Sequence, residues 1–145
     1  MYRCKSCDKK REDKRKWKDR LANESIEQRK NRLATTKKYN KSFNGKSSSL
    51  LKAYLNFDNS RGYENDLTLD DIKWAKTSKC VYCGYDATGF DRIDNKKGHT
   101  TDNVVPCCKE CNIARMDNFS HEEMFILGKA IKVVKDLRII NNIKL

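Results

Sequence analysis

The residues best suited to chemistry are cysteines in two C-x-x-C pairs, Cys80/Cys83 and Cys108/Cys111, with 24 residues between the pairs. A C-x-x-C turn lets two thiolates bind one ion at about 2.3 Å, and two such turns complete the tetrahedral shell of a structural zinc site. Buried free thiols or disulfides are the alternative. We expect Cys107 to be a small buried side chain, because C-x-x-C spacing to Cys111 favours Cys108 as the ligand.

A third pair, Cys4 and Cys7, has no fourth pair with which to complete a second zinc site. Three interpretations remain open. The pair is half of a site whose other half is missing, it takes ligands from another chain, or both thiols are idle, because one pair carries little positional information.

Two side chains near the cysteines offer oxygen ligands for a divalent cation. Asp91 lies in a β-prone run, and Asn112 follows Cys111 directly. Hydrolysis of a phosphodiester needs such a cation and a group that orients or deprotonates a water, and Mg²⁺ would keep several waters in so sparse an oxygen site. Taken singly, Asp91 would be a turn or strand-end carboxylate and Asn112 a helix N-cap.

The elements that must position these residues are short. Residues 90 to 93 and 103 to 105 are β-prone and predict two strands around a loop. Capping boxes that begin at Thr68 and Ser120 predict a short helix before the cysteines and a longer one after them. The longer helix is expected to close the core or to dimerise through an apolar stripe of Met124, Leu127, Ile131 and Val134.

The amino-terminal part of the sequence carries nearly all of the net charge of +12. Residues 1 to 46 hold 17 Lys and Arg against six Asp and Glu, whereas residues 47 to 145 hold 15 against 14. Residues 8 to 40 lack Gly and Pro, which predicts a weakly amphipathic basic helix with a break near Asn23, and residues 41 to 49 are expected to be a linker. A concentrated basic arm is typical of proteins that bind a polyanion.

Hydropathy excludes other classes. The mean hydropathy is −0.91, and no apolar run approaches the roughly 20 residues of a membrane span. The start of the sequence lacks the apolar core of a signal peptide. We therefore expect a cytoplasmic protein with no membrane partner.

Several motifs occur together between the zinc pairs. They are D-R-I-D from Asp91, G-H-T-T-D-N ending at Asn103, and C-K-E-C-N from Cys108. Their order resembles that of the HNH, or ββα-metal, endonucleases, particularly phage-type members, over about residues 66 to 127. The resemblance implies an α+β fold: a small zinc-stabilised ββα-metal core with flanking helices and a basic helical arm. The charge distribution divides the chain into an arm, residues 1–46, with the incomplete C-x-x-C knuckle, and a body, residues 47–145, which the resemblance makes an endonuclease domain.

The resemblance also implies roles for individual residues. Asp91 and Asn112 would hold the catalytic Mg²⁺ or Mn²⁺, because the family's zinc site fixes both around one cation. Asn103 matches the middle Asn of the HNH motif, which holds the loop by hydrogen bonds. If the gene comes from a phage, the protein would act in the host cytoplasm.

One position departs from the family pattern. Most HNH nucleases have a histidine general base directly after the aspartate, whereas this sequence has Arg92, whose pKa is too high for an ordinary base. Arg92 would hold the scissile phosphate or depress the pKa of a neighbouring Tyr or His, and another group would remove the proton. The base would be His99, whose ordinary pKa is near 6.5, or else Tyr82 or Tyr85. A packing or phosphate-contact role for His99 remains open, and we expect the second histidine, His121, to be a surface residue.

The predicted function is hydrolysis of phosphodiester bonds in duplex DNA, with a homodimer as an open possibility. The alternatives are a zinc-stabilised DNA-binding protein without activity and an RNA-binding zinc-ribbon adaptor. Basic residues of the arm and of the central loop are expected to contact the DNA backbone. These residues are Lys14, Arg15, Lys16, Lys18, Arg29, Lys30, Arg32, Lys37, Lys38, Lys96 and Lys97.

Overall fold

The structure is a computed structural model that describes residues 5–141, with side chains from residue 9 onward. Cys4 and the side chain of Cys7, the predicted second zinc pair, therefore lie outside the described residues. The chain forms two compact units, residues 1–41 and residues 42–145. None of the helices between residues 5 and 141 is both long enough and apolar enough to cross a membrane.

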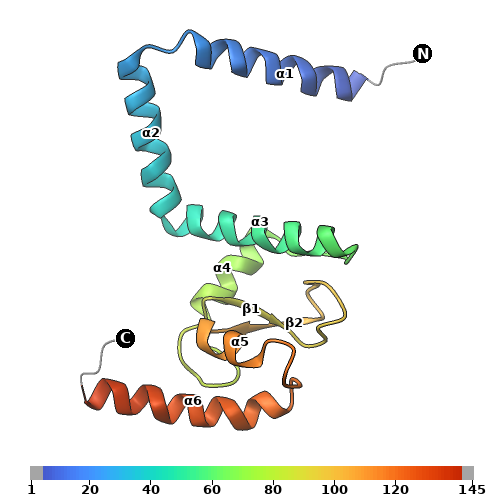
Figure 1. Cartoon of the computed structure of the whole chain (residues 1–145), viewed down its shortest axis with the longest axis vertical. Coiled ribbons are helices and arrows are strands. Elements are labelled where there is room, and N and C mark those ends of the chain that lie inside the picture. Colours follow the sequence, from blue (N-terminus) through green and yellow to red (C-terminus); the bar gives the residue numbers. More distant parts are fainter. Residues whose placement is uncertain (1–4, 142–145) are drawn as a thin grey trace. The chain divides into compact units, whose positions relative to one another are not determined.

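The first unit consists of two helices, α1 (Lys5–Ala22) and α2 (Ile26–Lys41) (Figure 1). The break predicted near Asn23 is confirmed. Ser25 Oγ accepts a hydrogen bond from the backbone N–H of Gln28 at 3.2 Å, and Gln28 Oε1 accepts one from the backbone N–H of Ser25 at 2.9 Å. This reciprocal capping box starts α2. None of residues 9–41 is buried, so these residues of the arm form no hydrophobic core.

The predicted linker at residues 41–49 is wrong, because this segment begins helix α3 (Phe43–Arg61). Ser42 is the N-cap, and its Oγ accepts a hydrogen bond from the backbone N–H of Gly45 at 3.1 Å. The hydroxyls of Ser47 and Ser49 donate to the carbonyls of Phe43 and Gly45. The serines that suggested a flexible segment therefore have two roles in α3. Ser42 caps the helix, and the hydroxyls of Ser47 and Ser49 donate to carbonyls of the preceding turn.

A two-stranded sheet and the helix that follows it form the centre of the second unit. Strand β1 (Gly89–Arg92) pairs antiparallel with β2 (Val104–Cys107), with Asp91 opposite Val105. Helix α5 (Lys109–Arg115) follows directly. Helices α4 (Leu69–Thr77) and α6 (Glu123–Ile140) flank this ββα unit, and the capping box predicted at Thr68 opens α4 (Figure 1). The predicted α+β fold is confirmed.

Two small clusters of buried side chains make up the core. One lies between the sheet and helices α3 and α4 and is built on Leu67, Ile72, Ala75 and Phe90. The other surrounds the cysteines and includes Met124 of α6, with Leu127 and Ile131 packed against it. The prediction that α6 closes the core is thus confirmed for these three residues. Val134 is 45% exposed and lies outside this core, so the alternative that the stripe dimerises stays a prediction there.

Gly128 explains how α6 comes so close to the cysteines. A Cβ atom at this position would collide with the backbone carbonyl of Tyr82. Only glycine lets the helix backbone approach the C-x-x-C turn at this distance.

Candidate active site

Four buried cysteines, Cys80, Cys83, Cys108 and Cys111, place their sulfur atoms within 4.8 Å of one another. Ligands at about 2.3 Å in a tetrahedron around zinc would lie about 3.8 Å apart, and the Cys83 and Cys108 sulfurs are 3.6 Å apart. The four cysteines are free thiols, which excludes the disulfide alternative. The donor set and its spacing fit a structural zinc ion.

Local structure around each pair explains this convergence. The first C-x-x-C turn closes with a hydrogen bond of 2.8 Å from the backbone N–H of Gly84 to the carbonyl of Cys80, and Gly84 has a φ of +75° that favours glycine. Cys108 is the N-cap of α5, and Cys111 lies in its first turn. Cys107 is buried beside the cluster and is not one of its four members, as predicted.

The carboxylate of Asp91 is held from one side only. Its Oδ2 accepts hydrogen bonds from the Tyr82 hydroxyl at 2.7 Å and from Arg115 Nη1 at 2.9 Å. Every buried side-chain nitrogen and oxygen in the described part of the chain has a partner. Both bonds go to Oδ2, and Asp91 borders the cleft described below, so Oδ1, which neither bond occupies, is left open as a possible metal ligand.

A cleft of about 610 Å³ brings together four of the predicted catalytic residues: Asp91, Arg92, His99 and Asn112. The Asn112 side chain donates from Nδ2 to the carbonyl of Phe90 at 3.2 Å, so its amide oxygen is available as a ligand. Asn112 lies inside α5, whose N-cap is Cys108. The N-cap interpretation of Asn112 is therefore wrong, because the helix begins three residues before it.

His99 lies in the loop between β1 and β2, and its imidazole is held by the buried carboxylate of Asp58 on α3. Its Nδ1 lies 3.0 Å from each oxygen of Asp58, and its backbone N–H donates to Asp58 Oδ2 at 3.1 Å. The Tyr54 ring stacks on the imidazole at a centroid distance of 4.2 Å. Burial lowers the pKa of His99 below its usual 6.5, and the Asp58 carboxylate opposes part of this effect.

The two nitrogens of this imidazole have different surroundings. A carboxylate at Nδ1 favours the tautomer that carries the proton there. Nε2 then has the free lone pair, and His99, although only 6% exposed, borders the cleft. His99 therefore presents a proton acceptor to the cleft.

The tyrosines considered as alternative bases point elsewhere. The Tyr82 hydroxyl donates to Asp91. Burial is the larger cause that raises the pKa of Tyr82, and this hydrogen bond is the second cause. The Tyr85 hydroxyl donates to Asp136 Oδ1 on α6 at 2.5 Å. Neither tyrosine lines the cleft. The surface position predicted for His121 is also wrong, because it is partly buried and its Nδ1 lies 2.9 Å from the Tyr82 hydroxyl.

Arg92 and Asn103 hold the loop that connects the two strands. Arg92 Nη1 donates to the carbonyls of Asn95 and Lys97 at 3.1 and 2.9 Å. The buried Asn103 accepts from the backbone N–H of Asp94 at 2.9 Å, and it donates to the carbonyls of Asp94 and Gly98. Arg92 also borders the cleft, whereas Asn103 does not.

Phe57 supports two guanidinium groups in the cleft. The guanidinium carbon of Arg92 lies 4.8 Å from the ring centroid of Phe57, and that of Arg61 lies 3.8 Å from it. Both arginines border the same cleft as Asp91. Two positive charges in this cleft suit it to an anionic substrate.

Three residues that shape the site were not singled out from the sequence. Asp58 occupies a core-facing position of α3, three to four residues after Tyr54 and Leu55, and a carboxylate at such a position is a detectable signal. Arg115 follows Cys111 by four residues, so it shares its helix face. It is 2% exposed and also donates to the carbonyls of Arg92, Ile93 and Phe119. Nothing in the sequence pointed to Arg61.

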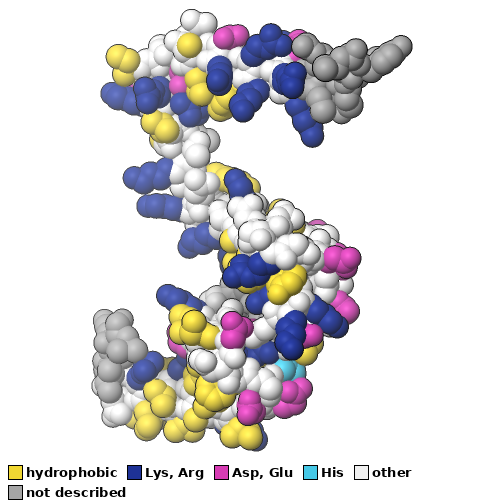
Figure 2. All heavy atoms as spheres, turned by 45° about the vertical axis from the view of Figure 1, so that its right-hand side comes forward, with side chains coloured by type: hydrophobic (Ala, Val, Ile, Leu, Met, Phe, Trp, Pro, Cys, Tyr) yellow, Lys and Arg dark blue, Asp and Glu magenta, His cyan; other side chains and the backbone are white. Residues whose placement is uncertain are grey.

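The residues expected to bind DNA are surface residues. Those of the arm are exposed except for Arg32, which donates from Nε and Nη2 to the Glu24 carboxylate at 2.7 and 2.9 Å. Lys16 pairs with Glu12 at 2.7 Å. Lys96 and Lys97 are exposed in the loop beside the cleft. Lys and Arg side chains stand out along both arm helices in Figure 2.

Comparisons with known proteins agree with this geometry. No family model matches the sequence, and no curated protein matches it. Among solved structures, the fold is similar to that of the rare-cutting HNH restriction endonuclease PacI, with 25% sequence identity and a TM-score of 0.55. The match covers 64% of this chain and 81% of that protein. The fold, the ββα arrangement around the cleft and the four-cysteine cluster together show that this chain has the HNH-type nuclease fold with a cluster that fits a zinc site.

Proposed function

We propose that this protein is a divalent-metal-dependent endonuclease that hydrolyses phosphodiester bonds in duplex DNA. The observation that carries the proposal is the cleft in which the open oxygen of Asp91, the amide oxygen of Asn112 and the imidazole of His99 lie together. The likeness to a DNA-cleaving HNH enzyme supports it. The four cysteines would hold zinc as a structural ion, because a closed set of four thiolates leaves no position for substrate.

Each residue then has a task in the reaction. Asp91 Oδ1 and Asn112 would hold Mg²⁺ or Mn²⁺, which offsets charge on the phosphate and the leaving oxygen. Tyr82 and Arg115 keep the Asp91 carboxylate in one orientation through its other oxygen. His99 would accept the proton of the attacking water at Nε2, because Asp58 fixes the Nδ1–H tautomer. Arg92 would bind the scissile phosphate from the face of Phe57.

The arm would hold the DNA backbone. Its charge excess implies several phosphate contacts, which position a protein on DNA without specifying bases. A DNA-binding protein without nuclease activity is the second candidate. Two features of Arg92 favour this candidate. Arg92 occupies the position of the family's usual histidine, and its Nη1 already donates hydrogen bonds to two loop carbonyls.

The experiment that separates these candidates compares nicking of supercoiled plasmid with binding of the same DNA. The purified protein is incubated with Mg²⁺, with Mn²⁺ or with neither, and its zinc content is checked in parallel. We expect nicking only with a cation, and loss of nicking without loss of binding in Asp91→Ala. The matched control is Asp86→Ala, which removes an exposed carboxylate whose partner is Lys79 and should leave nicking unchanged. Binding without nicking under all conditions would establish the second candidate.

A further inference from the structure

Helix α6 has two apolar faces, and only one of them packs on its own domain. Met124, Gly128 and Ile131 face the cysteine core. The opposite side carries apolar residues spaced alternately by four and three positions, a stripe formed by Ile126, Ala130, Val133, Leu137 and Ile140. The four larger side chains of this stripe are 74%, 57%, 51% and 73% exposed. Figure 2 shows apolar side chains on the surface along α6.

Spacing by four and three is that of a coiled-coil seam. The stripe extends over 15 residues, and its first and last residues are about 21 Å apart along the helix at 1.5 Å per residue. No other helix in the described chain exposes a comparable repeat. In the arm, Trp17 and Leu21 are exposed at a single spacing of four. The partner that matches this stripe in length and spacing is therefore another copy of α6.

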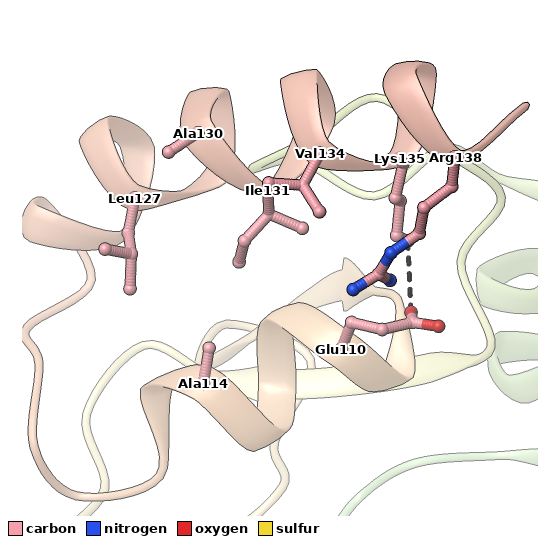
Figure 3. A pocket seen from close by; sticks show the side chains of 8 residues that line it. All are labelled: Glu110, Ala114, Leu127, Ala130, Ile131, Val134, Lys135 and Arg138. Carbon is pink, nitrogen blue, oxygen red and sulfur yellow. Dashed lines mark hydrogen bonds and ion pairs between the residues drawn. The ribbon is translucent and has the colours of Figure 1, made fainter. Parts of the chain in front are cut away.

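A shallow groove widens the apolar surface beside the stripe. It has a volume of about 280 Å³ and lies between α5 and α6, where it is bordered by Ala114, Leu127, Ala130, Ile131 and Val134. Figure 3 shows Leu127, Ile131 and Val134 pointing from α6 toward α5, with the Glu110–Lys135 ion pair closing one end. Because Ala130 belongs to both stripe and groove, a helix packed on the stripe would also cover part of the groove.

The charges beside the stripe select the orientation of the second helix. Lys129 and Asp136 lie seven residues apart on the same border of the stripe, and the Asp136 side chain is 41% exposed although it also accepts from Lys132 and Tyr85. In an antiparallel pair, with Ile126 opposite the partner's Leu137 and Ala130 opposite the partner's Val133, Lys129 would lie beside the partner's Asp136. Two-fold symmetry repeats the contact. A parallel pair would place Lys129 beside the partner's Val134 instead.

We infer that this protein forms a homodimer through an antiparallel pairing of α6 with α6 of a second copy. The inference does not depend on nuclease activity. It rests on the apolar repeat, its exposure and the self-complementary charges, all within one rigid helix. The pairing leaves the cleft residues Asp91 and Asn112 outside the interface, because they lie on β1 and α5 and do not border the groove.

Sedimentation velocity of the full, zinc-loaded chain without DNA tests the inference across a wide range of protein concentration. We expect a species of twice the 17.0 kDa chain mass that dissociates on dilution. Ile126→Glu and Leu137→Glu should give a monomer with unchanged helix content and zinc content. The matched control is Ile139→Glu, because Ile139 is 65% exposed on the same helix but lies off the stripe; it should remain dimeric.

The orientation has its own test. Lys129→Glu places two like-charged pairs in the antiparallel seam and should raise the dimer dissociation constant about tenfold at low salt, since exposed pairs each contribute a modest amount. A monomer at every concentration would overturn the dimer. Equal effects of Ile126→Glu and Ile139→Glu would overturn the stripe as its interface. An unchanged dissociation constant in Lys129→Glu would overturn the antiparallel orientation.

Discussion

Replacement of Asp58 by asparagine tests how the fold prepares His99 for catalysis. Asp58 is fully buried, and its two oxygens accept from His99 Nδ1, from the His99 backbone and from Asn65 Nδ2. Asparagine has nearly the same shape but only one acceptor oxygen. If this oxygen keeps the bonds to Asn65 and to the His99 backbone, the new NH₂ group faces His99 Nδ1. The imidazole must then carry its proton on Nε2, where it cannot accept one from water.

The expected magnitudes follow from this change of tautomer. Loss of a positioned general base typically costs 10² to 10⁴ in rate, so single-turnover nicking by Asp58→Asn should fall by roughly that factor. The effect on stability should be smaller, about 1 to 3 kcal/mol for the loss of a hydrogen bond to a charged group. Guanidinium unfolding of the zinc-loaded protein measures the second quantity. A large loss of rate with a modest loss of stability would identify a positioning role.

The pH profile provides an independent measurement. Burial depresses the pKa of His99, whereas Asp58 and Asp91 raise it and Arg92 lowers it. The neutral form is the base, so the rate of the wild-type protein should rise with pH through an inflection below pH 6.5 and be level at neutral pH. For the same reason, stability from the neutral buried imidazole is complete above pH 6.5 and declines as the pH falls through the folded-state pKa. Asp58→Asn should lose the inflection in rate.

Two further variants control this experiment. Asp66→Asn changes a neighbouring carboxylate that accepts from Thr101, in the same loop as His99, but does not contact the imidazole; it should retain nearly full activity. The double variant Asp58→Asn/His99→Ala should be no slower than His99→Ala, because both changes remove one function. A loss of less than about threefold in Asp58→Asn, or additive losses in the double variant, would refute the general-base role of His99.

Three other outcomes are expected. Elemental analysis should find one tightly bound zinc per chain. Because metal binding supplies folding free energy to a small core, Cys83→Ser should be largely unfolded or insoluble, whereas Cys107→Ser should destabilise the fold less. Deletion of residues 1–40, which keeps the Ser42 cap of α3, should weaken DNA binding and flatten the dependence of log K on log salt; an unchanged slope would show that the arm contacts something other than DNA. Asp91→Ala and Asn112→Ala should abolish nicking while zinc content and DNA affinity stay near wild type, and retained nicking in either would exclude it as a cation ligand.

The sequence by itself determined the parts of this protein that depend on local spacing. A C-x-x-C turn, a capping box and a short β-prone run each involve residues within a few positions of one another, so their geometry hardly depends on the rest of the chain. The zinc-site cysteines, the start of α4 and the two strands were therefore predictable. The charge excess of the arm was equally visible, because it is a property of composition.

Tertiary structure decided which distant groups meet. Asp58 and His99 are 41 residues apart, and only the packing of α3 against the loop joins them. Arg115 reaches Asp91 because the cysteine cluster fixes α5 against β1. The serines of residues 42–49 suggested a linker, yet the capping and back-bonding of α3 made the segment helical. The sequence of α6 shows apolar residues on two faces but does not show which face the core covers. The packing of one face against the domain decided that the other face is exposed.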